Sequence, residues 1–376
     1  MPRILIITGE ASGDLHGANL AHALKQADPA LSIVGIGGAR MGAEGIEMVR
    51  DVAQLDIMGL IGPAAVKTMI RRILKIRRVI RSEPWDLVVL IDNPGLNFHF
   101  ARVAKAAGRR VLYYIAPQIW AWRPRRIRWI QRRVDHVVVI LPFEADLYHR
   151  AGVRCTFVGH PLLDEVAPSY DRIELRKHFD LEEGRPVIGL LPGSRQGEIR
   201  SLLPVMLETA ARVSAHRPAV QFILAQAPSV SDALLQECLA QSRVPVRVVH
   251  GQASEVMAVA DLLFVASGTA TLQAAVVGTP MILLYATTWL TYRIAKFLIR
   301  VDCIGLVNLV AGRKIIPELI QQEATADCLH READRLLQDR KAYDEMRTAL
   351  RAIREKLGQP GASRRAAEIV LTECRL

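Results

Sequence analysis

Cysteine is scarce in this chain and is not arranged for any common cysteine chemistry. The five cysteines are an odd number, are scattered, and form no C-x-x-C pair, which excludes a disulfide framework and a zinc-binding module. The chain also lacks short repeats and low-complexity tracts. Hydrophobic residues at 51% and charged residues at 23% supply full cores, so a disordered or fibrous chain is excluded as well.

The sequence also lacks the signals of secretion and of membrane insertion. Met1-Pro2-Arg3 leads directly into the apolar residues Ile4 to Ile7, without the long apolar run and cleavage site of a signal peptide, so we expect a cytoplasmic protein. The uncharged stretch from Leu262 to Tyr292 is long enough to cross a bilayer. Because Ser267-Gly268 and Gly278-Thr279-Pro280 interrupt it, we interpret it as strands and a helix of a buried core.

Short runs of Val, Ile and Leu alternate with segments of helical period, which is typical of parallel sheets covered by helices on both faces. We expect strands at residues 3–8, 31–36, 86–91, 110–115 and 136–140, and again at 187–191, 220–225, 244–249, 262–266 and 281–285. At about 150 residues per domain, the 376 residues predict two α/β domains, each with a doubly wound, Rossmann-like sheet.

We place the domains at residues 1–168 and 186–345, with C-terminal helices at 346–376 that pack back toward the first domain. Two such domains facing one another surround a single cleft with the carboxyl ends of both sheets. Ligands of doubly wound sheets bind at those ends, so the functional residues are sought there.

Positive charge dominates and is concentrated in the first half. The net charge is +11, and residues 1–165 hold 23 Lys and Arg against 15 Asp and Glu, whereas the remainder holds 26 against 23. Such a balance favours anionic partners, namely phosphates, nucleotides, nucleic acid or an anionic membrane face. Nucleic acid has only composition in its favour, because no RNA- or DNA-binding signature is present.

The strongest basic segment is a predicted amphipathic helix over residues 64–81, which lies in a stretch of seven cations without an acid. An ordinary sheet-covering helix with a solvated basic face explains it. A helix that lies on an anionic lipid surface explains it equally well. The candidate membrane residues are Met69, Ile70, Arg71, Arg72, Ile73, Leu74 and Lys75.

Two turns in the first half end predicted strands in polar or small residues. The turn Gly9-Glu10-Ala11-Ser12-Gly13-Asp14 offers helix N-terminal amides to an anion or a hydroxyl, although it is not the G-x-G-x-x-G of dinucleotide-binding proteins. Asp92 ends another buried strand, where partial burial tunes a carboxylate toward a general base. The competing interpretations are a tight turn for the first segment and a helix cap for Asp92.

Two turns in the second half have the composition of anion-binding loops. Gly193, Ser194 and Arg195 follow one strand, and Ser267, Gly268 and Thr269 follow another. Glycine lets a ligand approach the backbone, and arginine binds phosphate in a bidentate manner. Two such loops on one sheet favour a diphosphate over plain turns.

Residues 308–321 add a further candidate binding segment. Pro317 and Glu318 suit the first turn of a helix, so a structural cap explains them, whereas as a binding group Glu318 suits a ribose diol. No D-x-D pair occurs in the chain, so a metal-dependent sugar-nucleotide site has no obvious carboxylate ligands, and we expect neither a metal nor a cofactor.

These motifs, taken in order, resemble the lipid A disaccharide synthase family of glycosyltransferases. The resemblance covers nearly the whole chain, and it is carried by Gly9 to Asp14, Ile91-Asp92-x-Pro94, Pro117 to Arg123, Leu141 to Glu144, Val158 to Pro161, Leu191 to Arg195, Ser267 to Leu272 and Asn308 to Gln321. It implies the two-domain GT-B fold and an inverting transfer of 2,3-diacylglucosamine from its UDP-sugar to 2,3-diacylglucosamine 1-phosphate. It further implies a peripheral location on the cytoplasmic face of the inner membrane and no nucleic-acid partner.

Carried onto this chain, the resemblance assigns Asp92 as the base on the acceptor 6-hydroxyl and Arg195 as a group that meets the donor diphosphate. The remaining donor-site candidates are Gly193, Ser194, Ser267, Gly268, Thr269, Asn308, Glu318 and Gln321. The acceptor-site candidates are Glu10, Ser12, Gly13, Asp14, Asn97, Trp120 and Trp122.

Two positions depart from the family pattern, and two other functions remain open. Gly95 stands where a carboxylate is common, and Gln273 stands where a glutamate is common. Another GT-B enzyme acting on a UDP-sugar, such as an epimerase or a soluble-acceptor transferase, is the first alternative. A basic membrane- or RNA-binding protein without enzymatic activity is the second.

Overall fold

The computed structural model describes residues 2–9, 11–50, 52, 63–117, 119, 126–287 and 303–375, which form two compact units. Unit 1 comprises Met1–Asp164 and Leu357–Leu376, and unit 2 comprises Glu165–Lys356. The chain thus passes from unit 1 to unit 2 after Asp164 and returns after Lys356, whereas the sequence analysis drew these limits at 168 and 346.

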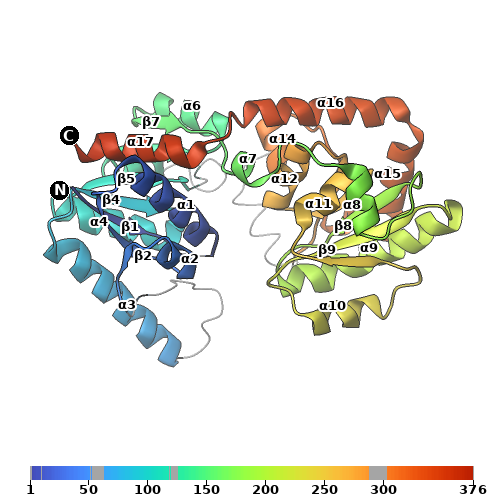
Figure 1. Ribbon diagram of the computed structural model, residues 1–376, viewed down its shortest axis with the longest axis horizontal. Helices are drawn as coiled ribbons and strands as arrows, with labels where there is room; N and C mark the ends of the chain where they lie inside the picture. Colours follow the sequence, from blue (N-terminus) through green and yellow to red (C-terminus); the bar gives the residue numbers. More distant parts are fainter. Residues whose placement is uncertain are drawn as a thin grey trace. The chain divides into compact units, whose positions relative to one another are not determined.

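Unit 1 is built on a parallel sheet of seven strands in the order β3-β2-β1-β4-β5-β6-β7 (Figure 1). The strands are β1 (Arg3–Ile7), β2 (Ser32–Ile36), β3 (Glu47–Met48), β4 (Leu87–Ile91), β5 (Arg110–Tyr114), β6 (His136–Val139) and β7 (Cys155–Phe157). The helices are α1 (Ala11–Ala27), α2 (Ala39–Ala43), α3 (Pro63–Ser82), α4 (Pro94–Ala106), α5 (Ile127–Gln131), α6 (Pro142–Arg150), α17 (Ala362–Cys374) and the short α7 (Leu162–Glu165), which passes into unit 2.

Unit 2 repeats the design with six parallel strands in the order β10-β9-β8-β11-β12-β13. The strands are β8 (Val187–Leu191), β9 (Gln221–Gln226), β10 (Arg247–His250), β11 (Leu262–Ala266), β12 (Met281–Tyr285) and β13 (Glu318–Ile320). The helices are α8 (Arg172–His178), α9 (Gln196–His216), α10 (Asp232–Leu239), α11 (Ala253–Val259), α12 (Thr269–Val277), α14 (Leu306–Ala311), α15 (Ala326–Gln338) and α16 (Arg340–Lys356), with a 3-10 turn η2 (Gln321–Glu323).

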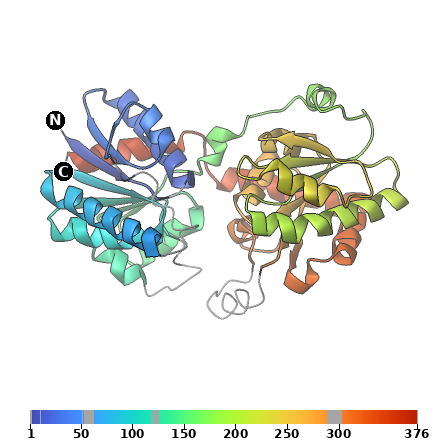
Figure 2. The same cartoon turned by 90° about the horizontal axis from the view of Figure 1, so that it is seen from below.

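Both faces of sheet 1 are covered, as the continuous apolar strands predict. Along β1, Ile4 and Ile6 join the core beneath α1 and α17, whereas Leu5 and Ile7 join the core beneath α3 and α4. Figures 1 and 2 show these two helix pairs on opposite sides of the sheet. The two-residue side-chain period of a buried strand therefore explains why both faces are apolar. The doubly wound α/β class predicted from the sequence is confirmed.

The C-terminal helix is fastened to sheet 1 by one buried carboxylate. Glu373 of α17 is 1% exposed and pairs with Arg110 at 2.5 Å, Arg154 at 2.7 Å and His136 Nδ1 at 3.0 Å. These partners lie at or just before the first residues of β5, β7 and β6. The amino edge of the sheet thus holds a clasp of two arginines and one histidine around a single acid.

Among the described residues, no helix combines the length and the apolarity that crossing a membrane requires.

We predict that Glu373→Gln destabilises unit 1 by about 2 kcal/mol, because the neutral amide loses the charge-assisted contacts that the buried carboxylate makes with Arg110 and Arg154. Urea unfolding followed by tryptophan fluorescence measures this, since four of the five tryptophans lie before residue 165. The control is Glu368→Gln, an exposed glutamate of the same helix, which should change stability by less than about 0.5 kcal/mol. Equal effects of the two substitutions would contradict the clasp.

A second prediction concerns the stability of unit 1 at acidic pH. Burial lowers the pKa of both His16 and His160 to about 4, and for His160 the charge of His16 lowers it further. The unfolded chain binds protons on these residues near pH 6.5 and the folded unit does not, so unit 1 loses stability as the pH falls below that value. We expect about 1.4 kcal/mol per pH unit for each histidine, measured as urea midpoints at pH 7, 6 and 5. The double variant His16→Gln/His160→Asn should flatten this slope, and an unchanged slope would refute the assignment.

Candidate active site

The predicted site residues of each unit lie at the point where the order of its strands reverses. In sheet 1, β1 pairs with β4, and these strands lead into the turn at 9–14 and into Asp92. In sheet 2, β8 pairs with β11, and these strands lead into Gly193–Arg195 and Ser267–Thr269. Ligands of open parallel sheets bind outside the carboxyl ends at such a reversal. The structure therefore brings together the two motifs of each unit.

In unit 1, the backbone around Asp92 is held in a costly conformation. Asp92 has φ of 51°, Asn93 has φ of 41°, and Ile115 at the end of the neighbouring strand β5 has φ of 56°. Left-handed backbone is disfavoured for all residues except glycine and is most unusual for a β-branched residue such as Ile115. Strain of this kind persists only where the surrounding structure enforces it, and it gathers at functional sites.

Two buried side chains hold Asp92 in place. Asn97 Nδ2 and the Tyr113 hydroxyl each donate a hydrogen bond to the Asp92 carbonyl oxygen, both at 2.7 Å. Burial, and next the charge of Asp92, raise the pKa of Tyr113 well above its ordinary value, so the hydroxyl remains a donor. Asn97, predicted as an acceptor contact, is 1% exposed and also donates to the Ile91 carbonyl, so it shapes the turn.

The helix cap at this turn is not Asp92. The Asn93 side chain accepts a hydrogen bond from Leu96 N at 3.4 Å and so caps α4. The capping interpretation of Asp92 is therefore wrong, and its side chain lies half-buried at the carboxyl edge of the sheet.

The first turn packs tightly against the second. A Cβ atom on Gly9 would lie 1.7 Å from Asn93 Nδ2, so only glycine fits there. Asp14 is buried, and its carboxylate accepts hydrogen bonds from the backbone N–H groups of Gly38 at 2.7 Å, Arg40 at 3.1 Å and Met41 at 3.3 Å. This carboxylate caps α2. Ser12 is exposed and Gly13 is buried, whereas Glu10, Trp120 and Trp122 lie outside the described residues.

In unit 2, the turn after β8 already contains a carboxylate. Glu198 Oε2 accepts from Ser194 N at 3.1 Å and from Arg195 N at 3.2 Å, and Glu198 Oε1 pairs with Arg195 Nη1 at 3.0 Å. Gly193 has φ of 108°, and a Cβ there would meet Glu198 Oε2 at 2.3 Å. Glu198 is not among the predicted site residues, although a glutamate three residues after the N-cap residue is the signature of a capping box. The Arg195 side chain itself is 68% exposed.

The turn after β11 differs, because no side chain caps the helix that follows it. The N-cap of α12 is Gly268, which has no side chain to accept hydrogen bonds from the first turn of the helix. Thr271 Oγ1 donates instead to the Gly268 carbonyl at 2.9 Å. The first N–H groups of α12 thus lie at the switch point without a side-chain acceptor in the described part of the chain. Gln273, one of the departures from the family pattern, donates to Ser254 Oγ at 2.7 Å.

The segment 308–321 corrects one expectation. Glu318 begins strand β13 and not a helix: β13 pairs with β12 at the sheet edge, and Leu283 N donates to the Pro317 carbonyl at 3.0 Å. Glu318 is 3% exposed and accepts from Ile304 N at 3.0 Å, Gly305 N at 2.9 Å and Asn308 Nδ2 at 2.7 Å. These bonds arrange the loop before α14.

The two remaining candidates of that segment also make internal contacts. Asn308 Oδ1 accepts from Ile315 N and Ile316 N, at 2.7 and 3.0 Å. Gln321 follows β13 at the carboxyl edge, where it exchanges two hydrogen bonds with the backbone of Thr287, at 2.7 and 3.0 Å. Both amides therefore hold loops that adjoin the edge strand β13.

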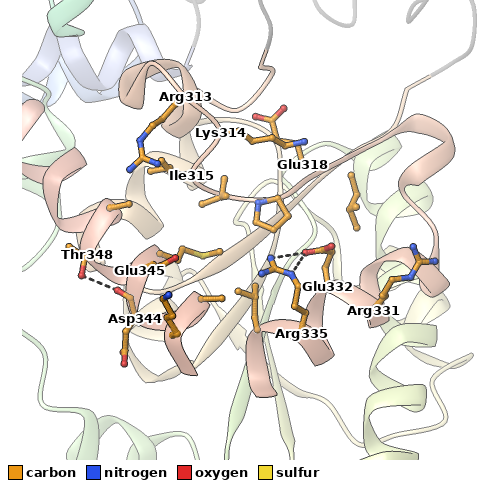
Figure 3. A pocket seen from close by; sticks show the side chains of 18 of the residues that line it. Arg313, Lys314, Ile315, Glu318, Arg331, Glu332, Arg335, Asp344, Glu345 and Thr348 are labelled. Atoms are coloured by element: carbon orange, nitrogen blue, oxygen red, sulfur yellow. Dashed lines mark hydrogen bonds and ion pairs between the residues drawn. The ribbon is translucent and has the colours of Figure 1, made fainter. Parts of the chain in front are cut away.

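A large hollow in unit 2 lies away from these turns. It encloses about 1250 Å³ between the segment 313–319, α15 and α16 (Figure 3). Five cations and five acids line it, and Arg335 pairs with Glu332, three residues before it on α15, at 2.9 Å. Such a balanced lining does not select an anion. Of the predicted donor residues, only Glu318 borders this hollow.

Among the described residues, no group of three or more His, Cys, Asp or Glu side chains is placed to hold a metal ion.

Comparison with known proteins gives a consistent result. A family model described as lipid-A-disaccharide synthetase matches residues 4–372. The lipid-A-disaccharide synthase of Geobacter sulfurreducens is 46% identical over 370 residues, covering 98% of this chain and 96% of the relative. That of Myxococcus xanthus is 40% identical over 375 residues, covering 98% and 97%.

Solved structures share the fold at much lower identity. A UDP-GlcNAc 2-epimerase from Neisseria meningitidis bound to UDP-GlcNAc matches with a TM-score of 0.66 and 14% identity, over 98% of this chain and 100% of that chain. MurG of Acinetobacter baumannii matches with a TM-score of 0.62 and 13% identity, over 99% and 100%. These likenesses show the GT-B fold. The family match across nearly the whole sequence shows that this chain belongs to the lipid-A-disaccharide synthetase family.

Proposed function

We propose that this glycosyltransferase joins 2,3-diacylglucosamine from its UDP-sugar to 2,3-diacylglucosamine 1-phosphate, making a β-1,6 bond and releasing UDP. The observation that carries the proposal is the position of Asp92 in unit 1 and of the two anion-binding turns in unit 2, each at a switch point. Family membership supports the choice of substrates. The epimerase alternative is not favoured, because the epimerases share only the fold, at about 14% identity.

In this proposal Asp92 is the general base. Its carboxylate removes the proton of the acceptor 6-hydroxyl, and the hydroxyl oxygen then attacks the anomeric carbon of the donor. The attack comes from the face opposite the leaving UDP, so the α-linked donor gives a β-linked product. The two hydrogen bonds to the Asp92 carbonyl support this role, because they fix the residue before substrate arrives.

The departing diphosphate needs positive charge, and unit 2 supplies it from two sources. The Arg195 guanidinium is largely exposed, and the N-terminal N–H groups of α12 carry the positive end of a helix dipole. Preorganised donors of this kind stabilise charge that develops in the transition state. We therefore expect transfer to proceed without a divalent metal ion.

Both substrates carry acyl chains. We propose that α3 binds the enzyme to the anionic inner membrane, on the cytoplasmic face of that membrane. Of the predicted membrane residues, Met69 and Ile73 pack against the core, whereas Ile70 is 52% exposed and Leu74 is 53% exposed. Lys75 Nζ donates to the Arg50 carbonyl at 2.6 Å. Exposed apolar side chains beside cations are the composition of an interfacial helix.

We predict that Asp92→Asn lowers turnover by about 10² to 10⁴, the usual contribution of a general base, while UDP affinity stays within about twofold. The assay mixes the purified enzyme with the two acylated substrates and EDTA and detects the disaccharide by mass spectrometry, and calorimetry measures UDP binding. The matched control is Asp86→Asn at the other end of β4, whose carboxylate accepts from Arg3 N.

Full turnover of the Asp92→Asn enzyme would end the base assignment. Turnover of UDP-N-acetylglucosamine without any transfer from the acylated donor would instead favour the soluble-sugar alternative.

We further predict that changing Arg71, Arg72 and Lys75 together to Glu abolishes pelleting with anionic vesicles at low salt, since each cation contributes about 1 kcal/mol near such a surface. The control reverses three exposed cations of unit 2, Arg243, Lys314 and Lys341, and so has the same net charge. Binding that survives the first change, or is lost equally in the second, would show that α3 is not the contact surface.

A further inference from the structure

Helix α3 exposes more apolar surface than its packing requires. Val66, Ile70 and Leu74 are 56%, 52% and 53% exposed, and in the described part of the chain only Ile173 is a comparably exposed large apolar residue. The inner face of the helix is already satisfied, because Ile76 and Ile80 are fully buried. Val66, Ile70 and Leu74 form an exposed stripe at four-residue spacing.

Two arginines lie on the same face of α3 as the exposed stripe, toward the C-terminal end of the helix. At 100° per residue, Arg77 and Arg81 fall within the same sector of about 80° as Val66, Ile70 and Leu74. One face of α3 thus changes from apolar to cationic along its length. A rise of 1.5 Å per residue makes the apolar part about 12 Å long, with the first arginine about 4.5 Å beyond it.

Helix α4 adds two more basic side chains at that end. His99 and Arg102 are three residues apart on one face of α4, which packs against α3. His99 Nε2 and Arg77 Nε are both buried, and neither has a hydrogen-bond partner in the structure. Buried polar atoms without partners are few in proteins, and each calls for a partner such as a water or an ion.

We call Arg77, Arg81, His99 and Arg102 the basic seam. No carboxylate in the described part of the chain pairs with any of these four residues. The nearby acids have other partners, since Glu83 pairs with Arg3 at 2.7 Å and Asp135 pairs with Lys105 at 2.8 Å. Burial first, and then the charges of Arg102, Arg77 and Arg81, lower the pKa of His99. The seam therefore places positive charge beside two buried polar atoms that have no hydrogen-bond partner.

We propose that the basic seam binds the phosphodiester headgroup of an anionic lipid, while Val66, Ile70 and Leu74 contact its acyl chains. The continuity of the stripe and the seam favours a lipid over free phosphate, because phosphate makes no use of the apolar part. Arginine forms bidentate hydrogen bonds with phosphate oxygens, and the bound anion favours protonation of His99. This inference deepens the membrane contact proposed for α3 and names its ligand.

Vesicle binding separates a built site from general attraction. We expect Arg77→Gln/Arg81→Gln to weaken binding to phosphatidylglycerol-containing vesicles at least tenfold more than Lys67→Gln/Arg78→Gln, which removes equal charge from exposed cations of α3 outside the stripe. Equal losses would overturn the site and leave the membrane contact of α3 standing. Absence of wild-type binding to these vesicles would overturn both.

A second measurement uses the wild-type chain, so that it does not depend on how a variant folds. The His99 imidazole is followed by NMR, assigned with His99→Gln, and titrated alone or with dihexanoyl phosphatidylglycerol, dihexanoyl phosphatidylcholine or inorganic phosphate. We expect the anionic lipid alone to raise the pKa of His99. An equal rise with inorganic phosphate would identify a free-phosphate site and overturn the lipid assignment, and no rise with any probe would overturn the seam as an anion site.

Discussion

The parallel strands are buried on both faces, and this constraint determines where polar and charged side chains lie in the molecule. β4 and β11 are buried along their whole length, so a polar side chain within them would lose its water without gaining a partner. In these two strands, polar side chains therefore come only directly before the first residue and directly after the last. In unit 1 the amino edge holds the structural clasp of Glu373, and the carboxyl edge holds Asp92. Stability and proposed chemistry occupy opposite edges of one sheet.

The two turns of unit 2 that are proposed to bind the donor diphosphate are alike in sequence and unlike in structure. The N–H groups after β8 donate to Glu198, and the helix after β11 starts without a side-chain cap. In the proposed donor site, a diphosphate therefore takes its backbone donors from α12 and its side-chain donor from Arg195, whose side chain is 68% exposed. The two turns differ because of local capping. Glu198, the third residue of α9, accepts from the N–H groups of the turn before that helix, whereas the N-terminal N–H groups of α12 have no side-chain acceptor in the described part of the chain.

Sequence patterns predict the parts of this structure that depend on local regularity. The continuous apolar runs of β1, β4, β8 and β11 locate both switch points, and with them the candidate site. β3, β7 and β13 were missed because two or three residues carry no measurable period. β10 starts at Arg247 and not at Val244, because Pro245 has no N–H to donate to a neighbouring strand.

Long-range contacts explain the other differences. Asp14 caps α2 more than twenty residues away, and Glu318 accepts hydrogen bonds from residues 304 and 305, which no helical or strand period reveals. The same limit applies to α3. Its sequence shows apolar and basic residues in helical order, but only the fold decides that Ile76 and Ile80 face the sheet while Val66, Ile70 and Leu74 face outward. Each of those outward side chains is about half exposed and so forgoes about half of the 1.5 to 3 kcal/mol of full burial, which a purely structural helix would not leave unused beside a cluster of unpaired arginines.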